Sequence, residues 1–108
     1  MFITEKRKND VKILELNGRI EGSADNFKAE IDDMIQRQTK ILVDCLGLNF
    51  INSSGLRVFL TTLKNVTANN GKIVICNLQK NVAEVFRISG FINLFEVYDT
   101  QDEAMNHL

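Results

Sequence analysis

The chain has 108 residues, a length that favours one domain with one hydrophobic core. Its 13 basic and 14 acidic side chains give a formal net charge of −1, so charge does not favour nucleic acid or an acidic membrane as a partner. Its apolar runs are only a few residues long, and the N-terminus lacks the apolar stretch of a signal peptide. We therefore expect no membrane segment and a cytoplasmic location.

The first part of the chain predicts a β-hairpin followed by a helix. Phe2 to Arg7 and Val11 to Asn17 have the composition of strands, with Lys8-Asn9-Asp10 as a turn and Gly18 as the end of the second strand. Ser23 is the expected N-cap of the first helix. Apolar residues at spacings of three and four predict its buried stripe, which consists of Ala24, Phe27, Ile31, Met34 and Ile35.

The middle of the chain predicts a central strand, a helix and a further strand. Ile41 to Cys45 is a short apolar run, typical of a strand that is covered on both faces. A helix is predicted from Leu56 to Val66, and Gly71 is suited to a left-handed conformation behind it. Lys72 to Cys76 is the next strand. The apolar residues of this helix fall at helical spacing and comprise Leu56, Phe59, Leu60, Leu63 and Val66.

The last part of the chain predicts a helix, a short strand and a terminal helix. Asn81 to Ser89 forms the helix, which Gly90 ends, and Phe95 to Tyr98 forms the strand. Thr100 to Glu103 matches a capping box for a helix that runs to Leu108. The inward residues of the two helices are Val82, Val85 and Phe86, then Ala104, Met105 and Leu108.

The predicted order of elements is β-β-α-β-α-β-α-β-α. Strands that alternate with helices after an opening hairpin imply an α/β fold with a mixed, mostly parallel sheet of about five strands and about four helices.

The cysteines and the histidine give no metal or redox signal. Cys45 and Cys76 lie in apolar strand-like runs, so we expect two buried free thiols. A disulfide is not expected in a reducing cytosol. The chain has one histidine, His107, and no CxxC pair, so no metal site and no cofactor are predicted.

An enzymatic function is not expected. Ser53 follows a strand and begins a helix, as in the nucleophile elbow of hydrolases, but the upstream glycine is missing and His107 is the only histidine. Asp44 is expected to end a strand next to the Ser53 loop, yet one carboxylate alone is a weak catalytic signal. Glycine-rich phosphate loops are absent, although a helix N-terminus can bind an anion weakly.

Ser53 and Ser54 stand where a strand turns into a helix, which leaves two interpretations open. A helix start has unpaired N–H groups and the positive end of the helix dipole, so a serine there can cap the helix. It can also accept a phosphate, whose charge of about −1.5 to −2 is tolerated by the dipole. Phosphorylation at Ser53 is therefore expected to leave the fold intact and change the surface.

The whole chain resembles the STAS domain, the fold shared by anti-sigma factor antagonists and the cytoplasmic tails of sulfate transporters. The motif Phe50 to Leu56 resembles the family's D-S-[ST]-G-[LI] phosphorylation motif. Leu16 to Glu21 resembles the family's L-x-G-x-L-D segment. The remaining likeness lies in Ile41 to Leu48, Asn69 to Cys76 and Val85 to Phe91. The resemblance implies a single STAS domain over residues 1–108.

The resemblance also implies a function. Stand-alone members bind an anti-sigma factor that is a serine kinase of the histidine-kinase-like ATPase fold, and binding releases the sigma factor. The kinase phosphorylates the first serine of the motif, which is Ser53 here with Ser54 as the alternative, and a PP2C-type phosphatase reverses this partner switching. The implied partner-binding residues are Glu21, Ser23, Asn52, Ser53, Ser54, Gly55, Leu56, Arg57 and Leu60.

Two positions depart from the family pattern. Asn52 stands where the family usually has Asp, and Glu21 stands where it usually has Asp. Asn caps a helix about as well as Asp but carries no charge. Two alternatives therefore stay open, a non-phosphorylated STAS scaffold or interaction module and a small-ligand or nucleotide-binding STAS domain. A monomer or weak dimer is expected, with an exposed Phe91 or Phe95 as a possible contact.

Overall fold

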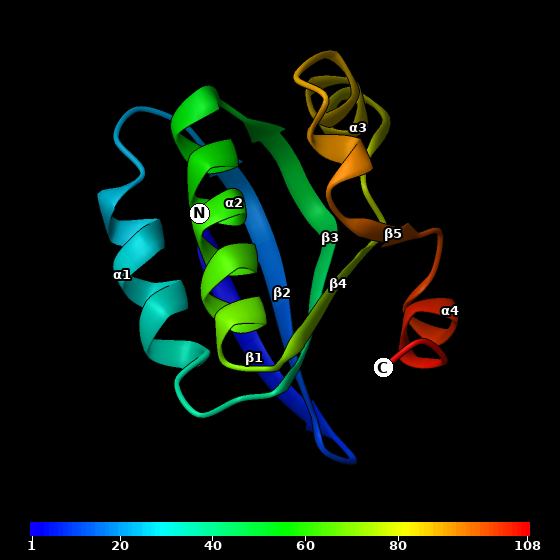
Figure 1. Cartoon of the computed structure of the whole chain (residues 1–108). Helices are drawn as coiled ribbons and strands as arrows, with labels where there is room; N and C mark the ends of the chain where they lie inside the picture. The colour runs from blue at the N-terminus through cyan, green and yellow to red at the C-terminus, as the bar shows by residue number, and fades with distance from the viewer.

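The computed structural model describes all 108 residues and is built on one five-stranded sheet, whose strands follow the chain order β1-β2-β3-β4-β5 (Figure 1). β1 runs antiparallel to β2, and every later pair is parallel. This is the mixed, mostly parallel sheet that the sequence predicts. The strands are β1 (Phe2–Lys8), β2 (Val11–Ile20), β3 (Lys40–Ile51), β4 (Lys72–Cys76) and β5 (Glu96–Tyr98).

Four α-helices and one short 3₁₀ helix connect and follow the strands. The predicted order of strands and α-helices is confirmed, while the 3₁₀ helix η1 (Phe91–Asn93) was not predicted. The α-helices are α1 (Asp25–Met34), α2 (Ser53–Ala68), α3 (Lys80–Ile88) and α4 (Gln101–Met105).

The sheet has a core on each face. The larger core holds 20 buried residues and packs the sheet against α1, α2 and α3, with the ring of Phe59 in contact with Phe27, Phe86 and Phe95. The smaller core holds six buried residues, with Ala104 of α4 among them. Because β3 is covered on both faces, Ile41, Leu42 and Val43 are buried one after another, as expected for a central parallel strand.

The two cysteines lie in different cores. Cys45 belongs to the larger core and Cys76 to the smaller one, and both are buried free thiols, as predicted. Burial raises the pKa of both thiols, that of Cys76 to about 12. The two thiols lie on opposite faces of the sheet, so the backbone of the sheet lies between them.

Two strands are longer than the sequence predicts. β2 does not end at Gly18 but runs to Ile20, and Gly18 (φ +102°) lies at an irregularity in the pairing with β3. β3 does not end at Cys45 but runs to Ile51. Asp44 therefore lies inside the strand, seven residues before its end, and not beside Ser53.

Several helix ends also differ from the prediction. The N-cap of α1 is Ala24 rather than Ser23, whose Oγ accepts a hydrogen bond from the Asp25 N–H at 3.3 Å. At the end of α2, Asn70 (φ 61°) takes the left-handed conformation expected of Gly71. Gly71 is required for another reason, because a Cβ there would lie 2.9 Å from Val66 Cγ1.

The last third of the chain follows the prediction more closely. Gly90 (φ +81°) follows the C-cap of α3, and Thr100 caps α4 by accepting from the Glu103 N–H at 3.1 Å. The Glu103 carboxylate completes the motif on the Asp99 N–H rather than on Thr100. α4 ends at Met105 instead of reaching Leu108. Phe95 is 7% exposed, so it cannot serve as an exposed contact for a dimer.

Candidate functional site

Asn52 is the only residue between β3 and α2, and it caps the helix. Its Oδ1 accepts a hydrogen bond from the Gly55 N–H at 2.9 Å, and its backbone carbonyl accepts the first helical bond from Leu56. No hydrogen bond within the chain involves the hydroxyl of Ser53 or Ser54. The cap is thus supplied by Asn52, and both serine hydroxyls remain available.

The Asn52 amide also joins α2 to the loop between β2 and α1. Its Nδ2 donates to the Gly22 carbonyl at 2.9 Å, and its backbone N–H donates to the Ile20 carbonyl at 3.1 Å. A carboxylate at this position has no proton to donate at neutral pH. The amide therefore makes a contact that the usual Asp of the motif cannot make.

The two serines differ in their surroundings. Ser53 is exposed, whereas Ser54 is half-buried and lines an open hollow of about 310 Å³ between α1 and α2. Ser23, Lys28 and Arg57 line the same hollow. Ser53 is therefore the more accessible of the two hydroxyls.

The structure brings most of the predicted partner-binding residues to one end of the molecule. Glu21 and Ser23 are exposed on the β2–α1 loop, which Asn52 holds against the first turn of α2. The Glu21 carboxylate accepts from Arg19 Nε at 3.1 Å. Arg57 is exposed one turn along α2, and Leu60 is half-buried on the next turn.

Gly55 and Leu56 do not belong to this surface. Leu56 is 5% exposed and is part of the larger core, so its side chain packs inside the domain. Gly55 is buried, and a Cβ there would lie 2.7 Å from Ile20 Cγ2 and 2.8 Å from Ile51 Cγ1. Its small size serves the packing of α2 on β2 and β3.

Asp44 is a structural carboxylate. It is 6% exposed and accepts three hydrogen bonds, from the Leu46 N–H, from Asn77 Nδ2 and from Gln101 Nε2, at 3.0, 3.1 and 2.9 Å. These bonds tie β3 to the end of β4 and to α4. The sequence did not reveal this network, because two of its three donors lie 33 and 57 residues away in the chain.

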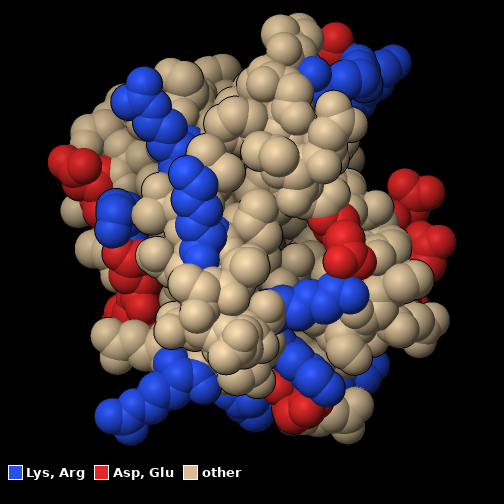
Figure 2. Space-filling view, in the orientation of Figure 1, with Lys and Arg blue, Asp and Glu red and all other residues tan.

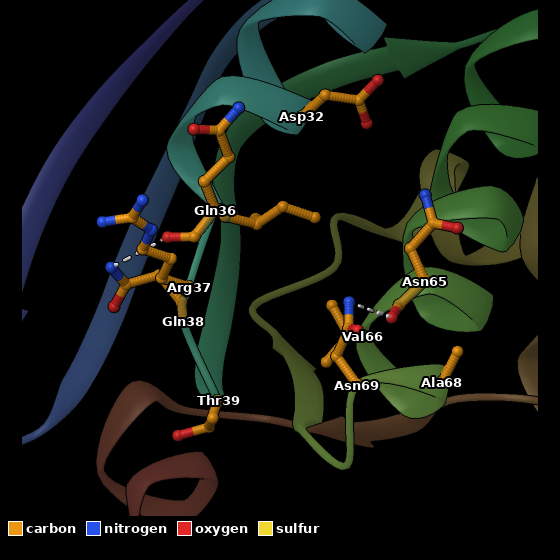
Figure 3. Close-up of a pocket in the computed structure, with 10 residues that line it drawn as sticks. Asp32, Gln36, Arg37, Gln38, Thr39, Asn65, Val66, Ala68 and Asn69 are labelled. Atoms are coloured by element: carbon orange, nitrogen blue, oxygen red, sulfur yellow. Dashed lines mark hydrogen bonds between the residues drawn. The ribbon is translucent and has the colours of Figure 1, made fainter.

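A larger hollow lies at the other end of α2. It has a volume of about 690 Å³ and lies between the last turns of α1 and α2 (Figure 3). Part of its polar lining is used within the chain: Asp32 pairs with Lys28 at 2.6 Å, and Asn69 Nδ2 donates to the Asn65 carbonyl at 3.0 Å. The Arg37 guanidinium points away from the hollow in Figure 3. No set of polar groups converges on it, so the Ser53 end of α2 is the better candidate site.

Residues 3–104 match the family model described as the STAS domain. The chain belongs to the STAS domain family. The resemblance inferred from the motif around Ser53 is thereby confirmed. No helix of this STAS domain is both long and apolar enough to span a membrane.

Relatives and solved structures agree with this assignment. BtrV of Bordetella bronchiseptica, described as an anti-sigma factor antagonist, is 31% identical over 106 residues, which cover 96% of this chain and 91% of BtrV. A Thermotoga maritima protein with the same description is 25% identical, with a TM-score of 0.86 and coverage of 97% and 92% of the two chains.

The fold is also that of the Bacillus protein SpoIIAA, an anti-sigma factor antagonist whose structure is known in unphosphorylated and phosphorylated forms. The unphosphorylated form is 23% identical to this chain, with a TM-score of 0.79 and coverage of 98% and 95% of the two chains. The predicted α/β STAS fold is therefore confirmed.

Proposed function

We propose that this STAS domain is an anti-sigma factor antagonist that acts in the cytoplasm by partner switching. It binds an anti-sigma factor that is also a serine kinase of the histidine-kinase-like ATPase fold. Phosphorylation of Ser53 ends the binding, and a PP2C-type phosphatase restores it. The observation that carries the proposal is the exposed, unbonded hydroxyl of Ser53 at the first position of α2. The description of BtrV and the two forms of SpoIIAA support it.

A phosphate on Ser53 is compatible with the fold. Because Asn52 caps the helix, the modification breaks no hydrogen bond of the Ser53 side chain. The N-terminal end of the helix dipole favours each negative charge by about 0.3–1 kcal/mol. At an interface, by contrast, an unpaired charge costs several kcal/mol, enough to abolish a micromolar complex.

Ser53 is the proposed acceptor rather than Ser54. A kinase must reach the hydroxyl, and Ser53 is exposed while Ser54 is half-buried in the hollow beside Lys28 and Arg57. Mass-spectrometric mapping of the protein from its own host, with and without the phosphatase, tests this choice. A phosphate found on Ser54 and never on Ser53 would refute it.

Substitutions at Ser53 test the switch. Ser53→Asp should weaken binding to the anti-sigma factor of the same host at least about tenfold, or about 1.4 kcal/mol, whereas Ser53→Ala should bind as the unmodified protein does. Asn65→Asp is the matched control, because Asn65 is exposed on the same helix and its side chain makes no hydrogen bond. Calorimetric titration measures the affinities. Equal affinities of Ser53→Asp and Ser53→Ala would exclude the switch.

Asn52 leaves one alternative open, a STAS interaction module that is not phosphorylated. This residue makes a structural contact to Gly22 and removes the carboxylate that normally precedes the modified serine. In that case protein from the host would carry no phosphate on Ser53, and Ser53→Asp would bind its partner unchanged.

A further inference from the structure

The outward face of α2 carries a stripe that begins at Ser53. We call Ser53, Arg57, Leu60 and Lys64 the α2 stripe. Their spacings of four, three and four residues place them on one face of the helix. Ser53, Arg57 and Lys64 are exposed, and Leu60 is half-buried. The stripe therefore offers two cations and one leucine on the same face as the proposed phosphorylation site.

The two cations of the stripe have no partner within the chain. Seven of the 13 basic side chains form ion pairs, and neither Arg57 nor Lys64 is among them. α2 contains no acidic residue, and Asp25, which lines the hollow beside Arg57, forms no ion pair with it. Figure 2 views the molecule from the side of α1 and α2 and shows basic side chains standing on this face.

Unpaired cations on one helix face complement an acidic surface. Complementary charges raise the rate of association and fix the orientation of a bound partner. Leu60, half-buried between Arg57 and Lys64, supplies an apolar contact. We propose, on the basis of the proposed function, that the partner presents acidic side chains to Arg57 and Lys64 along the α2 stripe.

An acidic partner surface gives a phosphate on Ser53 two ways to act. The phosphate repels the acidic groups of the partner directly. Ser53 and Arg57 are four residues apart on one helix, which places their Cβ atoms about 5–6 Å apart, and a phosphate pairs readily with an arginine at that spacing. The phosphate then competes with the acidic groups of the partner for Arg57. The same guanidinium thus serves in binding the partner and in the response to phosphorylation.

A titration without any partner tests the coupling between Ser53 and Arg57. Protein with phosphoserine installed at Ser53 is compared with its Arg57→Gln and Lys64→Gln forms by ³¹P NMR as a function of pH. Arg57→Gln should raise the second pKa of the phosphate by about 0.5, the effect of one unit charge at about 6 Å in water, and Lys64→Gln should leave it nearly unchanged. Identical titrations of all three proteins would overturn the coupling.

Binding to the anti-sigma factor tests the acidic surface. Arg57→Glu and Lys64→Glu should each weaken binding at least tenfold at low salt, and the loss should shrink as salt rises. Lys8→Glu is the control, since Lys8 is exposed, unpaired and placed on β1 away from α2. Equal effects of all three reversals would overturn the inference. Failure of the proposed function would look different, because the unmodified protein itself would not bind.

Discussion

Asn52 makes two side-chain hydrogen bonds that can be removed separately. Its Oδ1 accepts from the Gly55 N–H, and its Nδ2 donates to the Gly22 carbonyl, both at 2.9 Å. Asn52→Ala removes both bonds. Asn52→Asp keeps an acceptor for Gly55 and loses only the donor to Gly22. The pair of variants therefore separates the cap of α2 from the attachment of the β2–α1 loop.

The expected changes in unfolding free energy follow from these bonds. Loss of an N-cap costs about 1 kcal/mol, and loss of the second hydrogen bond costs about 0.5–1 kcal/mol, because water can solvate the exposed Gly22 carbonyl. Asn52→Ala should thus lose about 2 kcal/mol, or about 10 °C in melting temperature. In Asn52→Asp the interaction of the carboxylate with the helix dipole offsets about 0.3–1 kcal/mol, so its stability should lie within about 0.7 kcal/mol of the parent protein.

Urea unfolding followed by circular dichroism measures these stabilities, and hydrogen exchange reports on the loop. The backbone N–H groups of residues 22–24 should exchange faster in Asn52→Asp although its overall stability is nearly unchanged. Asn65→Asp serves as the control for added charge on α2, since its side chain makes no hydrogen bond. The reasoning fails if Asn52→Ala is as stable as the parent protein, or if Asn52→Asp loses as much as Asn52→Ala.

Two substitutions and two tests of the Cys76 thiol probe the core. The hydroxyl of Thr62 is buried without a hydrogen bond. Thr62→Val should therefore raise the unfolding free energy, measured in urea, by up to about 1 kcal/mol. A loss of stability would show that the hydroxyl does have a hydrogen-bond partner. Gly55→Ala should destabilise the fold by about 1–3 kcal/mol, since the new Cβ would lie 2.7 Å from Ile20 Cγ2; an unchanged urea midpoint would show that the core yields. Burial raises the pKa of Cys76 from 9.0 to about 12. The folded state therefore holds the thiol proton more tightly, and stability should be constant below about pH 9 and fall toward pH 12. Iodoacetamide at pH 8 should modify Cys76 only after unfolding, and modification of the folded protein would contradict this burial.

The local patterns of the sequence predicted the order of the elements and most of the core. Helical spacing placed Leu56 in the buried stripe of its helix, and the structure agrees with that spacing. The ends of β2 and β3 could not be predicted in the same way. These ends depend on the pairing of β2 with β3, which joins residues about 30 positions apart. The register of this pairing shifts near Asn17 and Gly18.

The candidate site was also predicted only in part, because some of its contacts join residues far apart in the sequence. Ser53 and Arg57 are exposed, and the position of Arg57 off the apolar stripe of its helix indicates this from the sequence. The role of Asn52 was visible only as a helix cap, because its second hydrogen bond reaches Gly22, 30 residues away. The sequence could not show that the β2–α1 loop depends on this side chain.

The arrangement around Asn52 separates the support of the helix from the proposed modification of Ser53. If Ser53 itself capped α2, a phosphate on its hydroxyl would replace the bond that starts the helix, and each switching event would change the stability of the fold. Here the cap is the neighbouring amide, which does not change when Ser53 is modified. The amide is also uncharged, so it does not repel a phosphate on the adjacent residue as a carboxylate would. The uncharged cap and the unpaired Arg57 one turn along α2 would therefore favour the proposed phosphate at Ser53, even though the chain lacks the Asp that usually precedes the modified serine in this family.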